Sequence, residues 1–166
     1  MRKLLAAKAL AAAIGASGAI FNRGNAGVAT IAVLVFAVLV FGIETVANRH
    51  RGFVAALNLL GLVLIITFAS LMGKMPSLDD AFYMMVLIAA LFQLLSETVV
   101  NFGNGWFKKN NSAHIINWSL HLIVWTLFAF ASPDTIGAIG IFGTYCGILA
   151  VHWGIEAAGP KPLKQD

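Results

Sequence analysis

The alternation of long apolar runs with short basic clusters constrains this chain most. A bilayer core of about 30 Å requires a helix of about 20 apolar residues, and five runs meet this length: residues 27–47, 53–73, 81–100, 113–131 and 135–157. A soluble domain of 166 residues could not bury this much apolar surface, because 60% of the residues are hydrophobic and only 11% are charged. The pattern predicts an all-α integral membrane protein whose main partner is the lipid bilayer.

The opening segment, residues 4–21, is a weaker sixth candidate for a transmembrane helix. It is rich in alanine and glycine, and it follows the basic residues Arg2 and Lys3. A basic start before a short apolar stretch also resembles a secretory signal peptide, but Lys8 interrupts the apolar stretch. We therefore expect an uncleaved first helix.

The distribution of basic residues favours six spans. With six spans and both termini in the cytoplasm, nine lysines and arginines lie inside, and only Arg23 and Lys74 lie outside. If the opening segment stayed outside, six of these basic residues would lie on one side of the membrane and five on the other. Because cytoplasmic loops carry an excess of Lys and Arg, the sequence predicts six transmembrane helices in the inner (cytoplasmic) membrane with both termini cytoplasmic. The basic residues behind the net charge of +4 lie in short clusters between the apolar runs. They therefore indicate membrane topology, and no nucleic-acid partner is expected.

An internal repeat accompanies these spans. The only three glutamates, Glu44, Glu97 and Glu156, are 53 and 59 residues apart. They lie in the similar segments GIETVAN, LSETVVN and GIEAAG, each near the end of an even-numbered helix. This spacing predicts one transmembrane domain over residues 1–166, built from three helical hairpins at about 1–50, 51–106 and 107–159, with a short polar tail over 160–166.

Polar residues near the cytoplasmic ends of the odd-numbered helices complement these glutamates. If each hairpin packs antiparallel, three pairs form: Lys8 with Glu44, Asn58 with Glu97, and His121 or Asn117 with Glu156. Such a polar cytoplasmic layer has two interpretations. It ties each hairpin together through interhelical hydrogen bonds, or it lines a vestibule for a proton or small solute, since ionisable residues within a span are functional candidates.

A metal site is a further hypothesis for the last hairpin. Four residues with metal-binding side chains recur at one-turn or two-turn spacing in the cytoplasmic halves of its helices: His114, His121, His152 and Glu156. Three imidazoles and a carboxylate suit zinc or another divalent ion. No other cofactor is expected. The sequence lacks a phosphate-binding loop, a nucleophile elbow, a His-Glu-x-x-His motif and a cysteine pair, so we expect no enzyme activity.

Small residues and tryptophans suggest how the helices pack. Gly143 and Gly147 form a small-xxx-small pair in the last helix, and Gly15 and Gly18 mark the first. Such residues allow close helix approach, either between the first and third hairpins or between copies of the chain. An aromatic belt at the cytoplasmic interface is expected from three tryptophans: Trp106, Trp118 and Trp153.

The last hairpin also carries a family resemblance. Its segments Ala131-Ser132-Pro133, Gly143-Thr144-Tyr145 and Gly154-Ile155, within an arrangement of three hairpins, are similar to the HdeD-type acid-resistance membrane proteins, whose pattern includes a Pro-containing outer turn. The first hairpin departs from this pattern because its outer turn lacks proline. The resemblance implies a six-helix inner-membrane protein associated with stress or acid tolerance. The three glutamates are not carried over from that family.

Three functions therefore stay open. The first is a stress-related inner-membrane protein, either single or oligomeric. The second is an accessory structural subunit of a larger membrane complex, which a broad glycine-rich face on the last helix would favour. The third is a small-solute or proton transporter or channel, which a cavity lined by the three glutamates would favour.

Overall fold

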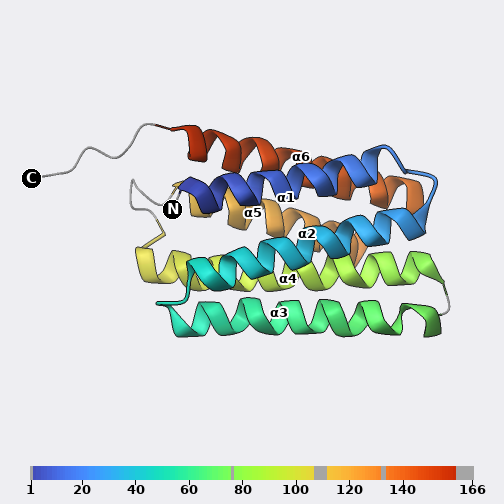
Figure 1. The fold of residues 1–166 in the computed structure, drawn as a ribbon, viewed down its shortest axis with the longest axis horizontal. Coiled ribbons are helices and arrows are strands. Elements are labelled where there is room, and N and C mark those ends of the chain that lie inside the picture. Colours follow the sequence, from blue (N-terminus) through green and yellow to red (C-terminus); the bar gives the residue numbers. More distant parts are fainter. Residues whose placement is uncertain (1, 76, 107–111, 132–133, 160–166) are drawn as a thin grey trace, which may run out of the picture.

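The protein is a bundle of six antiparallel helices (Figure 1). The computed structural model describes residues 2–75, 77–106, 112–131 and 134–159. The helices are α1 (Arg2–Ile20), α2 (Ala26–Ala47), α3 (Gly52–Leu71), α4 (Leu78–Asn104), α5 (Ser112–Thr126) and α6 (Thr135–Ala158). A 3₁₀ turn, Met72–Lys74, prolongs α3, and a π-helical turn, Leu127–Ala131, prolongs α5. With these turns included, all six are long and apolar enough to cross a membrane.

The six apolar segments expected from the sequence are all helical. The alanine-rich opening segment forms α1, and its alanines Ala11, Ala12 and Ala19 are buried against neighbouring helices. Large apolar side chains remain exposed on the outer surface of every helix, and Leu10 of α1 and Ile31 of α2 are two examples. A folded protein in water rarely exposes so much contiguous apolar surface, so the exposed side chains agree with a membrane protein that crosses the bilayer several times.

Side-chain caps determine where several helices begin. The spacing of Ser77 and Asp80 predicts a capped start for α4, and the Ser77 Oγ accepts a hydrogen bond from the Asp80 backbone N–H at 3.1 Å. Asn25 and Asp134 cap α2 and α6 in the same way, with N···O distances of 3.1 and 3.0 Å. The outer-turn residues 132–133 and the predicted tail 160–166 lie outside the described residues.

The contact between the first and last helices closes the bundle, and it is the most extensive contact between any two helices. Glycine permits this approach, because a Cβ atom added to Gly143 would lie 2.7 Å from Cγ1 of Ile20. Gly18 is equally close to Ala32 of α2. The predicted packing of the first helix on the last is therefore present at Gly143. Gly147 does not take part, since a Cβ atom added there would meet no other helix within 4 Å.

The third predicted hairpin is not a close helix pair. Helix α5 packs mainly on α4, and α6 packs mainly on α1, whereas α5 and α6 make few backbone contacts. The reason is side-chain size. The face between α5 and α6 carries His121, Tyr145 and Trp153, all of them buried, and these rings hold the two backbones apart.

Aromatic side chains fill the bundle interior from its middle towards one end. Phe36 of α2 and Phe82 of α4 both contact Phe142 of α6, with ring centroids 5.8 and 6.0 Å apart in edge-to-face arrangements. Tyr145 lies 6.1 Å from Phe36. These four buried residues are called the aromatic cluster below. Edge-to-face pairs stabilise a core beyond the burial of their area, so the cluster joins three helices firmly.

Candidate functional site

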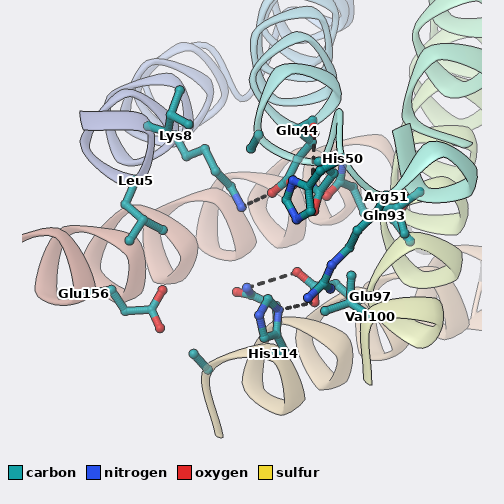
Figure 2. A pocket seen from close by; sticks show the side chains of 17 residues that line it. Leu5, Lys8, Glu44, His50, Arg51, Gln93, Glu97, Val100, His114 and Glu156 are labelled. Carbon is teal, nitrogen blue, oxygen red and sulfur yellow. Dashed lines mark hydrogen bonds and ion pairs between the residues drawn. The ribbon is translucent and has the colours of Figure 1, made fainter. Parts of the chain in front are cut away.

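A cavity of about 690 Å³ opens at one end of the bundle (Figure 2). At this end α1, α3 and α5 begin and α2, α4 and α6 end (Figure 1). We call this end the terminal end. Every helix contributes to the wall, and the lining residues are Leu4, Leu5, Lys8, Glu44, Ala47, Asn48, His50, Arg51, Val54, Gln93, Ser96, Glu97, Val100, Ala113, His114, Asn117 and Glu156. The volume lies within the range of about 300–1,000 Å³ typical of small-molecule sites.

The cavity reaches well into the bundle. At 1.5 Å of rise per residue, Glu97 lies about 10 Å and Gln93 about 16 Å from the end of α4. All three glutamates line the wall, one each from α2, α4 and α6. Of the seven residues predicted for the polar layer, the structure places five in the cavity wall: Lys8, Glu44, Glu97, Asn117 and Glu156. Asn58 and His121 are not among the lining residues.

Lys8 and Glu44 form the first predicted pair. The Lys8 Nζ donates to Glu44 Oε1, and both side chains are mostly buried. The second carboxylate oxygen of Glu44 accepts from Asn48 Nδ2 at 2.6 Å. The same ammonium lies 4.1 Å from the centroid of the Trp153 ring, close enough for a cation–π contact. Lys8 therefore connects α1 to both α2 and α6.

Glu97 has partners on α5, so its predicted pairing with Asn58 is wrong. His114 Nδ1 lies 2.8 Å from Glu97 Oε2, and Asn117 Nδ2 donates to Glu97 Oε1 at 3.2 Å. Asn58 instead accepts from Gln93 Nε2 at 3.3 Å and donates to the Val54 carbonyl oxygen at 2.9 Å. Because α4 packs against both α3 and α5, the carboxylate can turn to either neighbour.

Asn117 extends this network to α6. Its Oδ1 accepts a hydrogen bond from Trp153 Nε1 at 3.0 Å. Trp153 is completely buried, so its predicted place in an interfacial belt is wrong. Its neighbours explain the burial, because the indole has a polar partner for its N–H and a cation over its face. Together these contacts link Glu44, Lys8, Trp153, Asn117 and Glu97, which come from five different helices.

Glu156 differs from the other two carboxylates. Its closest ionic partner within the described residues is His152 Nε2, at 3.9 Å on the same helix. The predicted pairing with His121 or Asn117 is wrong, because α6 packs on α1 and Asn117 is engaged by Glu97. Figure 2 shows Glu156 entering the cavity from the α6 side with its carboxylate directed inward. It is the carboxylate in the wall most available to a bound molecule.

His121 lies outside the cavity wall and is fully buried. Its Nδ1 is 2.6 Å from the hydroxyl of Tyr145, and the two rings meet edge to face. This contact attaches α5 to the aromatic cluster. The polar-layer prediction grouped His121 with Glu156, but the imidazole contacts Tyr145 of α6 and does not line the cavity.

The predicted metal site is not assembled. His114 pairs with Glu97, His121 with Tyr145, and His152 with Glu156. Within the described parts of the chain, no group of three or more His, Cys, Asp or Glu side chains could hold a metal ion. His114 and His121 of α5 each contact a different neighbour, and neither of these two pairs includes His152 or Glu156, which residue spacing within each helix does not reveal.

Five polar residues of the wall were not among the predicted site residues: Asn48, His50, Arg51, Gln93 and Ser96. The Ser96 Oγ is buried and has no hydrogen-bond partner within the described residues. Gln93, Ser96, Glu97 and Val100 follow the i, i+3, i+4, i+7 spacing of one helix face. That periodicity could have extended the polar face of α4 from Glu97 alone to the whole stretch.

Comparison with protein-family models, with curated proteins and with solved structures finds no match to this chain. The cavity itself is therefore the feature that indicates a function. Its wall combines carboxylates, amides, a hydroxyl and basic groups with apolar side chains such as Leu5 and Val54. Such a wall suits the binding of a small polar or amphipathic molecule.

Proposed function

We propose that the chain is a small-solute transporter of the inner membrane, with the cavity as its cytoplasmic vestibule. The observation that supports this most directly is one cavity enclosed by all six helices and lined by every glutamate of the sequence. Acidic groups at membrane depth are costly and usually serve a pathway. Hydrogen bonds that only join helices would not require a cavity around them.

The charge distribution supports the cytoplasmic orientation of the terminal end. Arg2, Lys3, Arg49 and Arg51 lie at this end of the bundle, whereas Arg23 and Lys74 lie at the opposite end. Basic residues gather on the cytoplasmic side of membrane proteins. We therefore propose that both termini and the cavity mouth face the cytoplasm.

The aromatic cluster supports a vestibule that is closed on the other side. Beyond the cavity, the interior is filled by the buried rings of Phe36, Phe82 and Phe142. Movement of a solute across the membrane then requires the helices to separate at this cluster. A role in stress or acid tolerance stays a prediction from the family resemblance, and we propose no catalytic activity.

Uptake into sealed proteoliposomes tests this proposal. Vesicles containing the purified protein are incubated with a cell extract of small metabolites, washed, and analysed by mass spectrometry. We expect selected compounds to accumulate in these vesicles above the level in protein-free liposomes. If the contents of the two kinds of vesicle are the same, the transport proposal is wrong.

Two matched variants assign the uptake to the cavity. Ser96→Phe places a ring in the cavity wall, whereas Leu95→Phe adds a similar ring one residue away, at an exposed position. We expect Leu95→Phe to keep the uptake and Ser96→Phe to abolish it. Equal uptake by both variants would show that the solute takes another route.

A further inference from the structure

The groups in the cavity wall divide into those bonded within the protein and those left for a ligand. Glu44 has its two oxygens occupied by Lys8 and Asn48, and Glu97 has its two occupied by His114 and Asn117. A molecule in the cavity would therefore have to compete with existing bonds at both sites. Neither carboxylate is the best candidate for ligand recognition.

Besides the exposed imidazole of His50, two groups of opposite charge remain, Glu156 and Arg51, and they enter from different sides. Glu156 is only 3.9 Å from a histidine of its own helix, with no closer ionic partner within the described residues. Arg51, at the start of α3, uses one nitrogen to donate to Asn104 Oδ1 at 3.1 Å, and a guanidinium has five N–H donors. Helices α3 and α6 lie on opposite sides of the bundle (Figure 1), and Figure 2 shows the two side chains on opposite sides of the cavity.

The same cavity wall holds one polar group that is unsatisfied within the described residues, together with several apolar side chains. The Ser96 side chain is 5% exposed, and its buried Oγ has no partner within the described part of the chain. A buried hydroxyl without a partner is costly, so a ligand atom that bonds to it gains affinity. Leu5, Val54 and Val100 supply apolar wall in the same cavity, which suits methylene groups rather than a second row of charges.

From this arrangement we infer that the solute of the proposed transporter is a small zwitterion with an apolar middle. Its protonated amine binds Glu156, its carboxylate binds Arg51, and Ser96 contacts the polar end nearest to it. The inference rests on the proposed function and names the substrate class of that same cavity. A zwitterion supplies an opposite charge to Glu156 and to Arg51 at once. A lone cation or anion would leave one charge unanswered in a partly buried site, which is unfavourable.

Matched probes test the charge requirement. Unbranched ω-amino acids of two to eight carbons are compared with the amine and the carboxylate of the same chain length, using isothermal titration of the protein in nanodiscs. We expect one ω-amino acid to bind at least tenfold more tightly than both its amine and its carboxylate. Equal binding of the amine or of the carboxylate would overturn the inference, as would the absence of binding by every ω-amino acid.

Two variants assign the ends of the probe. Arg51→Gln should weaken the best ω-amino acid at least tenfold and leave the matched amine unchanged. Glu156→Gln should weaken the ω-amino acid and the amine but leave the carboxylate unchanged. Arg49→Gln removes an exposed charge outside the cavity wall two residues from Arg51 and should change nothing. If Glu156→Gln fails to fold, the preference among the wild-type probes and the Arg51→Gln result still decide the inference.

The outcome separates this inference from the proposed function. Metabolites from the extract can accumulate in vesicles, with this uptake abolished by Ser96→Phe, while no ω-amino acid is preferred in the binding measurement. In that case the cavity transports a solute of another class, and only the inference is wrong. If neither uptake nor probe binding occurs, both proposals are wrong.

Discussion

Around the cavity, the helices are joined through the tips of long polar side chains, whereas in the aromatic cluster α2, α4 and α6 meet through rigid rings. Lys8, Glu44 and Glu97 line a space of about 690 Å³. Phe36, Phe82 and Phe142 leave almost no exposed surface, each being at most 1% exposed. The polar region can change its bonds by rotating side chains. The aromatic region can change only if helices move, because a densely packed core does not deform gradually.

This difference assigns separate tasks to the two regions. The aromatic cluster should contribute most to stability, and the polar region should contribute most to recognition of a solute. The following variants, given in order of decreasing expected effect, test that division.

Phe142→Ala should have the largest effect on stability. Removing a fully buried ring that contacts Phe36, Phe82 and Tyr145 should lower the free energy of unfolding by about 3–5 kcal/mol. Phe142→Leu keeps much of the volume and should cost about 1.5 kcal/mol. Both are measured by reversible unfolding in detergent micelles. A loss below about 1 kcal/mol for the alanine variant would contradict a packed cluster.

Lys8→Met should follow, with a loss of about 3 kcal/mol, because it leaves the Glu44 carboxylate mostly buried without its ammonium partner. The double variant Lys8→Met/Glu44→Gln removes both charges, so it should recover more than half of that loss. The same unfolding measurement applies. If the loss in the free energy of unfolding for the double variant equals the sum of the losses for the two single variants, the two side chains are not coupled.

Trp153→Phe should lower the free energy of unfolding by less than Lys8→Met does. It removes the hydrogen bond from Nε1 to Asn117 Oδ1 but retains an aromatic face near Lys8. Interhelical hydrogen bonds in membranes contribute about 0.6 kcal/mol on average and about 1.7 kcal/mol at most. A double-mutant cycle with Asn117→Ala should yield a coupling energy within that range. A coupling energy of zero would remove this link between α5 and α6.

Ser96→Ala should have the smallest effect on stability, within about 0.5 kcal/mol, because the hydroxyl has no partner to lose within the described residues. Thr98→Ala is the matched control two residues away. Thr98 accepts from Trp118 Nε1 at 2.9 Å, so its removal should cost about 1 kcal/mol. A larger loss at Ser96 than at Thr98 would show that Ser96 has a structural partner and weaken its assignment to ligand binding.

The sequence predicts where the helices of this protein lie along the chain better than it predicts which helices pack against each other. Apolar runs and caps such as Ser77 are local features, so the six helices follow from them directly. The Lys8–Glu44 pair also follows, since α1 and α2 are consecutive antiparallel neighbours. The same reasoning fails for α5 and α6, where the glycine face of α6 packs on α1 and large rings occupy the face towards α5.

The site shows the same limit. Spacing placed the three glutamates at one end of the bundle, and the structure places them around one cavity. The spacing could not determine which neighbouring helix each carboxylate would contact, since every helix has at least two neighbouring helices. Glu97 therefore faces Asn117 rather than Asn58, and the histidines of the expected metal site point to different partners. Residue spacing along one helix determines a face, but the partner of that face depends on packing.

The most direct test of a one-sided polar cavity is the accessibility of Ala113→Cys, at a partly exposed position of the cavity wall, in a Cys146→Ala background. Cys146, the only native cysteine, is fully buried and serves in the wild type as the unreactive control. We predict that a charged, membrane-impermeant thiol reagent labels the Ala113→Cys protein in inside-out vesicles, where the cytoplasmic side is exposed, and does not label it in right-side-out vesicles. Labelling only in right-side-out vesicles, or in neither, would contradict a vestibule open to the cytoplasm.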